Sequence, residues 1–449
     1  MDVAPNLRRQ GLERLLDLPP VVLSLWCSLL LPLPQTLLVS AIATAELGPG
    51  LGLIALALIG AGNVMITAGL SEAIVRLGED SKGRTTLPAV ADFYLGPIGR
   101  RVATFAILTM WFTALVGGQI GFIDVMAGLT GTPQIPWLLG LTVLIIGLNR
   151  RRSLGFSSML LLSLLTFLLL AGISLDLIPR MNPVSLASFW VPLAQVDPWQ
   201  LPNWSSLLAI SFYTYFGPSL LAPTASFVLQ QDRTGRSMIR GSIAGSLGLI
   251  GVVMVWLGLI SRALPRQNLL TMKGTVLVAL GNTGGTLLPW LCAALAITLS
   301  GFSAIRAGGV LGNQLRDLPV AQSSWGQKLV PALPTLLSLI LILVWMHSGA
   351  TNLTTALSIG GGLGIPIGCW IIPSMIMRQA RRMKPGPVPS SWPLAGHPWI
   401  TFGLITIGLL ILLFFGLLAW SWWPIKFLAV GLAVGLTLWN LRLQPVNRA

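Results

Sequence analysis

Residues 211–223 read Ser-Phe-Tyr-Thr-Tyr-Phe-Gly-Pro-Ser-Leu-Leu-Ala-Pro and lie inside an apolar run from Trp204 to Leu229. The run is long enough to cross a bilayer as a helix, which takes about 20 residues. Gly217-Pro218 and Pro223 interrupt the backbone hydrogen bonding and predict a break near its middle. Within a membrane, freed carbonyls are tolerated only where protein or a wet cavity satisfies them. The stretch therefore predicts either half of a binding site for a small solute or a kinked helix without a ligand.

The composition around this stretch is that of an all-α polytopic membrane protein. The chain has 449 residues, of which 54% are apolar and 9% are charged. Its three cysteines are widely spaced inside apolar runs, so the sequence predicts neither a disulfide framework nor a metal cluster. No cofactor is expected.

Apolar runs of sufficient length predict about 12 transmembrane helices. The runs are 21–45, 50–76, 98–127, 135–149, 154–178, 204–229, 238–262, 286–312, 329–347, 351–377, 399–420 and 422–441.

The distribution of charge gives these spans an orientation. With the N-terminus inside, 23 of the 28 Lys and Arg residues, Arg306 among them, belong to cytoplasmic segments. The other five are Arg180, Arg262, Arg266, Lys273 and Lys426. This asymmetry predicts a multi-pass protein of a bacterial-type plasma membrane with both termini cytoplasmic. It also explains the net charge of +15 without nucleic acid as a partner.

The first span contains a second interruption. Pro32 and Pro34 lie in its middle, followed by the polar residues Gln35 and Thr36. Interrupted helices at matching positions of two halves are typical of inverted-repeat transporters. We therefore expect one transporter domain over residues 1–449, with repeats at about 21–178 and 204–377 and two extra helices at about 399–441. Chance placement of these prolines is the alternative.

Several short motifs then suggest a family. Ala45-Glu-Leu-Gly48, the segment Tyr215–Pro223, Asp232-Arg-Thr-Gly-Arg-Ser-Met-Ile-Arg-Gly-Ser242 and Ala296-Ile-Thr-Leu-Ser-Gly-Phe-Ser303 resemble segments of the amino acid/auxin permease family. This family belongs to the amino acid–polyamine–organocation superfamily, and the sequence is most similar to its bacterial tryptophan/tyrosine permease branch.

The resemblance implies the leucine-transporter-type 5+5 fold with broken helices 1 and 6. It also implies proton- or sodium-coupled amino acid uptake at the bacterial inner membrane. One departure stands out, because the family usually has Gly-x-Gly at the first break. Here that position is Pro34-Gln35-Thr36, and Pro34 offers no backbone donor.

The expected substrate is a small amphoteric solute, a hydrophobic or aromatic amino acid, bound between the two breaks. Aromatic rings would stack against its side chain. The residues expected at the pocket are Pro34, Gln35, Thr36, Gln119, Phe122, Tyr213, Thr214, Tyr215, Phe216 and Gly217, with Thr298 and Ser300 closing it. The lipid bilayer is the other expected partner, and the sequence does not decide the oligomeric state.

Two carboxylates are candidates for coupling transport to an ion. Glu72 is either an i,i+4 partner of Arg76 or a proton-carrying or gating group. Asp124 either protonates during transport or lies in water at the outer vestibule.

Three hydroxyls of the eighth span, on Thr298, Ser300 and Ser303, are candidate sodium ligands because sodium prefers oxygen donors. Their alternative role is bonding to backbone or neighbouring helices. The family resemblance favours protons over sodium.

Other classes of function find less support. The chain has none of the H-E-x-x-H, G-x-S-x-G or P-loop motifs, which argues against an enzyme. Its two histidines, His347 and His397, lie at or beyond span ends, which argues against a membrane haem subunit. No charged ring or filter motif indicates a channel. A non-transporting sensor with a permease fold, or a sodium-coupled transporter of another organic solute, is the alternative.

Overall fold

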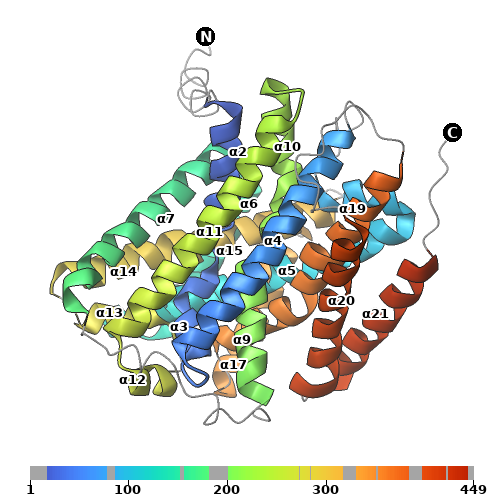
Figure 1. Cartoon of the computed structure of the whole chain (residues 1–449). Helices are drawn as coiled ribbons and strands as arrows, with labels where there is room; N and C mark the ends of the chain where they lie inside the picture. The colour runs from blue at the N-terminus through green and yellow to red at the C-terminus, as the bar shows by residue number, and fades with distance from the viewer. Residues whose placement is uncertain are drawn as a thin grey trace.

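The structure is a computed structural model. It describes residues 18–77, 86–151, 156–181, 201–272, 274–283, 285–316, 330–349, 352–383, 397–420 and 423–442. Every regular element in these ranges is a helix (Figure 1).

Within the described ranges, nine helices are long and apolar enough to cross a membrane. They are Pro49–Arg76, Leu87–Thr130, Ser158–Leu177, Arg236–Ala263, Leu287–Leu315, Val330–His347, Leu353–Arg382, Pro398–Ala419 and Trp423–Arg442. Their outer faces expose large apolar side chains, such as Leu58 (69% exposed), Val255 (60%) and Trp290 (75%). Polar side chains such as Gln35 and Glu72 are instead buried. This is the architecture of a multi-pass helical membrane protein, as the composition predicts.

The long helices without π-helical segments are α4 (Pro49–Arg76), the kinked α5 (Leu87–Thr130), α6 (Gln134–Arg151), α7 (Phe156–Leu177), α11 (Arg236–Ala263), α17 (Leu333–His347) and α21 (Trp423–Arg442). Three others contain π-helical segments. They are α14–η7–α15 (Leu287–Ala296, Ile297–Gly301, Phe302–Arg316), α18–η10–η11–α19 (Leu353–Ile359, Gly360–Gly364, Pro366–Ile371, Ile372–Arg382) and α20–η12 (Pro398–Phe414, Phe415–Ala419). Short helices complete the list: η4 (Ile178–Arg180), α12 (Arg266–Thr271), α13 (Val276–Thr283) and η9 (Val330–Ala332).

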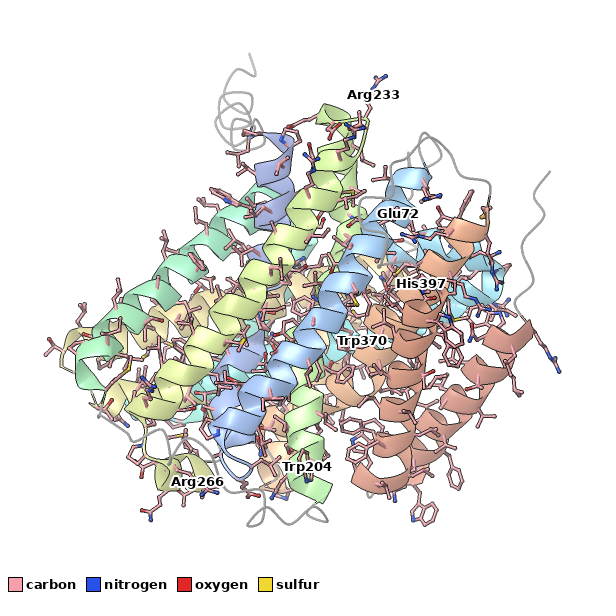
Figure 2. All side chains as sticks on the ribbon, in the orientation of Figure 1. Glu72, Trp204, Arg233, Arg266, Trp370 and His397 are labelled. Carbon is pink, nitrogen blue, oxygen red and sulfur yellow. The ribbon has the colours of Figure 1, made fainter. Side chains whose placement is uncertain are left out.

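Two helices are broken, where the prolines predict breaks. The first consists of α2 (Pro20–Leu29), η2 (Gln35–Leu38) and α3 (Ser40–Thr44). The second consists of α9 (Leu201–Thr214), η6 (Gly217–Leu220) and α10 (Leu221–Gln231). α2 begins on the upper side of Figure 1, whereas α9 begins on the lower side, where Trp204 is labelled in Figure 2. The two broken helices therefore run in opposite directions.

The start of α5 differs from the prediction, which placed this segment in a connection before a span at 98–127. Thr86 accepts a hydrogen bond from the Ala89 N–H and caps the helix, which begins at Leu87. The helix then kinks at Gly96, whose φ is 75°, immediately before Pro97. The piece before the kink packs on α4, because the Tyr94 hydroxyl donates to the Ala73 carbonyl at 2.7 Å.

α2, α4, α10 and α11 form one packed group. The closest contact is between α2 and α11, where Gly241 and Gly245 face α2. A Cβ at either glycine would lie 2.5 Å from a backbone oxygen of α2. Small residues four apart allow this close approach of membrane helices. α5, α6 and α15 form a second packed group, and α20 and α21 lie at one edge of the molecule (Figure 1).

The glycines of η10 bring that segment against α9 without intervening side chains. A Cβ on Gly361 would overlap the Ala209 carbonyl, and one on Gly360 would overlap Thr113 and the Tyr213 ring. The second interruption is therefore held against a rigid, glycine-lined surface.

Candidate solute-binding site at two helix interruptions

The first interruption exposes carbonyls that other helices satisfy. α2 ends at Leu29, and Pro34 is extended, with φ −87° and ψ 141°, before η2 begins. The Leu31 carbonyl accepts a hydrogen bond from Arg306 Nη1 of α15 at 3.0 Å, and the Leu37 carbonyl accepts one from Trp256 Nε1 of α11 at 2.8 Å. The physical requirement that freed backbone groups be satisfied is thus met by side chains.

The second interruption is arranged similarly. The Phe216 carbonyl accepts from the Ser219 hydroxyl at 2.7 Å and from the Cys369 thiol at 3.6 Å. Pro223 does not break α10, because it lies in the first turn, where its missing N–H has no helical partner to lose.

The two interruptions touch. The hydroxyls of Thr36 and Thr214 are 2.7 Å apart, and both side chains are fully buried. Thr214 donates its own proton to the Ile210 carbonyl at 2.7 Å, so Thr36 is the donor in the pair. Gly217 faces Pro32, and a Cβ there would make an ordinary contact at 3.6 Å. The two breaks are therefore in direct contact through Thr36 and Thr214.

Gln35 links the first break to the second packed group. Its Nε2 donates to the Ala114 carbonyl of α5 at 3.0 Å and to the Ser303 hydroxyl of α15 at 2.6 Å. Its Oε1 is buried and has no hydrogen-bond partner among the described residues. Gln35 therefore links the first broken helix to both α5 and α15.

The aromatic residues of the second break have different environments. The Tyr213 hydroxyl donates to the Met110 carbonyl at 3.3 Å, and the Tyr215 hydroxyl donates to the Leu56 carbonyl at 2.9 Å. Both rings are buried. Phe216 lies edge-on to Trp111, with ring centroids 6.2 Å apart. The tyrosines are thus held by α5 and α4 in this conformation.

Two of the expected pocket residues on α5 point toward other helices. Gln119 donates to the Thr142 hydroxyl of α6 at 3.2 Å. The Phe122 ring lies edge-on to Trp137 of α6, at 6.2 Å between centroids, and its opposite contact is Gly301 of η7. These contacts join α5 to α6 and η7 rather than to the two breaks.

The three hydroxyls expected as sodium ligands have different environments. Thr298 donates to carbonyls of its own helix, at Ala294 (3.1 Å) and Leu295 (3.3 Å), and Ser303 accepts from Gln35. The Ser300 hydroxyl is buried near Gly121 and has no partner among the described residues.

Glu72 forms the predicted i,i+4 pair with Arg76, at 2.6 Å, and a second ion pair with Arg381 of α19, at 2.9 Å. The carboxylate is only 3% exposed. It therefore joins α4 to α19 near the upper side of the molecule (Figure 2). The sequence offered no signal for the partner on α19.

Asp124 holds the segment before α13. Its Oδ2 accepts from the Thr275 N–H at 2.7 Å, and a Cβ on Gly274 would lie 2.5 Å from the same oxygen. Asp124 was predicted either to protonate during transport or to lie in water at the outer vestibule. The hydrogen bond to Thr275 gives it a structural role that is different from both.

Arg306 is the residue that the sequence analysis misplaced. It was counted with the cytoplasmic charges, although the predicted span 286–312 contains it. The structure places it within α15, next to the first break, with its guanidinium 5.2 Å from the centroid of the Trp111 ring. Its position inside a predicted span was the signal that could have identified it.

Arg306 lines a cavity of about 270 Å³ beside the two breaks. The cavity wall is formed by Leu31 and residues of α5, α7, η6, α10 and α15. A second cavity of about 480 Å³, between α5, α15, α17 and α18, is lined almost entirely by apolar side chains. The first cavity alone combines a charged group with the interruptions.

Comparison of the sequence with protein-family models finds no match, and comparison with curated proteins finds none. The interpretation of the site therefore depends on its own residues and geometry.

Proposed function

We propose that the chain is a secondary active transporter that takes up a small amphoteric solute, a hydrophobic or aromatic amino acid, by alternating access. The observation that carries this proposal is the contact between two oppositely directed, interrupted membrane helices. Their freed carbonyls are satisfied by side chains rather than by closing the breaks. Broken helices at membrane depth are a costly feature that transporters use for solute binding.

The packing supports a moving unit. The packed group of α2, α4, α10 and α11 contains α10 and α2, which flank the breaks. α4 of this group packs on α19, and the Glu72–Arg381 ion pair lies at the same contact. Gln35 of η2, which follows α2, bonds to Ser303 of the second packed group. An ion pair and a hydrogen bond can be exchanged for other polar contacts as the unit rocks, so we assign both links to the moving boundary.

We also propose twelve spans in a leucine-transporter-type inverted repeat. The nine long helices together with α2–α3, α6 and α9–α10 would make this number. The opposite directions of α2 and α9 support inversion of the two halves. The positive charge asymmetry supports cytoplasmic termini in a bacterial inner membrane.

Protons are proposed over sodium as the coupling ion. Sodium requires several oxygen atoms that converge on one point. The Thr298 and Ser303 hydroxyls are engaged by different partners, which supports the proton reading. Glu72 and Asp124 are then the carboxylates to test.

The test is uptake of labelled tryptophan, tyrosine and leucine into proteoliposomes, with proton or sodium gradients imposed in turn. We expect proton-driven uptake of at least one of them. Sodium-driven uptake would contradict the coupling, and no uptake under either gradient would contradict amino acid transport.

A membrane sensor with a permease fold is the second candidate. It is favoured by the hydrogen bonds that hold Gln35, Thr36 and Thr214 to protein partners. A sensor would bind a solute in detergent micelles but would show no flux in proteoliposomes.

A further inference from the structure

The charge of Arg306 has no counter-charge in the part of the chain that the structure describes. Its contacts there are the Leu31 carbonyl and the face of the Trp111 ring. Glu72, a buried carboxylate within the helices, forms its ion pairs with Arg76 and Arg381. A neutral carbonyl and an aromatic face stabilise a cation but do not neutralise it, and a charge at membrane depth is expensive without a partner.

The surroundings of the guanidinium indicate what its partner would look like. The cavity holds the volume of about nine water molecules at ~30 Å³ each, near the lower end for binding pockets. Leu31, Ile107, Leu220 and Val310 give it an apolar wall. The cavity therefore suits a small molecule with an apolar body and one anionic end.

Two of the three side-chain hydroxyls at the cavity wall already donate to backbone carbonyls, and the third is that of Thr86. Ser219 donates to the Phe216 carbonyl at 2.7 Å, and Thr224 donates to the Leu220 carbonyl at 2.8 Å. Arg306 uses Nη1 for the Leu31 carbonyl, and the remaining donors of its planar fork match a carboxylate in a bidentate arrangement.

Pro34 at the first break adds to the argument that the Arg306 guanidinium binds a carboxylate. Pro34 has no N–H, so the break lacks one backbone donor that could face a carboxylate. A guanidinium already hydrogen-bonded to the same break can take over that role from α15.

We propose that Arg306 is the carboxylate-recognition residue of a subsite in this cavity, with the apolar wall of Ile107, Leu220 and Val310 holding the apolar end of the ligand. The substrate class is a small carboxylate with an apolar body. Its identification with the transported solute rests on the proposed function, but carboxylate binding itself does not.

A purely structural role for Arg306 must be separated from this one. The guanidinium lies at the C-terminal end of α2, where a cation is favourable for the helix regardless of ligand. Such a role predicts that its removal weakens every ligand equally. Carboxylate recognition predicts a change in the ratio between an acid and its neutral amide.

The experiment measures binding by calorimetry on the full-length protein in detergent micelles. The probes are two matched pairs, 3-phenylpropionate with 3-phenylpropanamide and butyrate with butanamide. We expect the wild type to prefer the acid in at least one pair by about 10- to 100-fold, as for charge-assisted hydrogen bonds. Arg306→Gln, which keeps a donor for Leu31, should bring the ratio close to one.

Two further variants complete the test. Arg306→Lys should retain a preference for the acid, because it keeps the charge, but with lower affinity because it loses the fork. Arg240→Gln, at an exposed position of α11, should leave the ratio unchanged. If Arg306→Gln does not fold, the ratios of the wild type and Arg306→Lys decide.

A wild type without acid preference in either pair overturns the proposal, and so does an unchanged ratio in Arg306→Gln. Preferential binding of the acid without flux of any solute would contradict the proposed transport but support this subsite. Solute flux with an acid-to-amide ratio that is unchanged in Arg306→Gln would support transport but contradict this subsite.

Discussion

The hydrogen bond between Thr36 and Thr214 offers a direct test of whether the two interruptions are energetically coupled. Thr36 donates and Thr214 accepts over 2.7 Å, and both side chains are 0% exposed. Thr→Val replaces each hydroxyl by a methyl group of similar size. The four proteins, wild type, two single variants and the double variant, form a double-mutant cycle.

The magnitude follows from the geometry. A hydrogen bond between membrane helices is worth about 0.6 kcal/mol on average and up to about 1.7 kcal/mol. This pair is short and fully buried, so we expect a coupling energy of about 1 to 1.5 kcal/mol. Thr214→Val should be costlier than Thr36→Val. It leaves a buried donor unsatisfied, whereas the reverse change leaves only an acceptor.

The assay is reversible unfolding of the purified protein in mixed micelles of increasing SDS content, followed by circular dichroism. A control cycle pairs Thr36→Val with Thr437→Val. Thr437 lies on α21 and bonds to its own helix at the Ala433 carbonyl. The control coupling should be near zero. A Thr36–Thr214 coupling below about 0.3 kcal/mol, within the error of additivity, would refute the contact.

Three further predictions use the same unfolding measurement. Gly361→Ala should lower the free energy of unfolding by about 1–3 kcal/mol, because the added Cβ would overlap the backbone of α9. Gly140→Ala, whose added Cβ would have no heavy atom within 4 Å, should raise the free energy of unfolding by about 0.5–1 kcal/mol. Glu72→Gln should cost about 1–3 kcal/mol because the buried carboxylate loses its ion pairs with Arg76 and Arg381, and Glu46→Gln, at an exposed site, should change little. Although partial burial acts to raise it, hydrogen bonds from Thr234 and Ser237 lower the pKa of Asp232 to about 2 from its ordinary 3.8. Asp232→Asn should therefore cost about 1 kcal/mol at pH 7, and the difference from wild type should fade as the pH falls from about 4 to 2.

Each of these has an outcome that would contradict it. Equal effects of the two alanine substitutions would mean that α9 does not rest on the glycines of η10. A neutral Glu72→Gln would mean that the link to α19 is solvated. An Asp232→Asn deficit that persists below pH 2 would mean that the ionised carboxylate does not cap α11.

The breaks were predictable because proline acts locally. Pro32, Pro34 and Gly217-Pro218 change the backbone wherever they stand, so the sequence indicates both interruptions. The two interruptions were expected near one another because they occupy corresponding positions in the two predicted repeats. The start of α5 at Leu87 was missed because a kinked helix outside the apolar run carries no hydropathy signal.

The partners of the polar side chains were not predictable in the same way. Gln35 was expected to face a solute, but its amide is bound by residues 79 and 268 positions away. Arg306 was assigned by a count of charges that ignored its own position in a span. Contacts across such distances in sequence depend on how helices are rotated against one another, and a near-uniform apolar sequence gives little information on rotation.

The sequence separation between two hydrogen-bonded residues determines how long the first waits for the second during synthesis. Ribosomes add about 5–20 residues per second, so Ser303 follows Gln35 by roughly 13–54 s. During that interval the prolines and polar groups of the first helix are in or near lipid before their partners exist, and each unsatisfied group there is unfavourable by several kcal/mol. The nascent first helix must therefore wait beside the insertion machinery, or in contact with other polar surfaces, until the eighth span arrives. We therefore expect a product truncated before residue 303, which lacks the partners that Ser303 and Arg306 provide for the first helix, to be degraded in the cell.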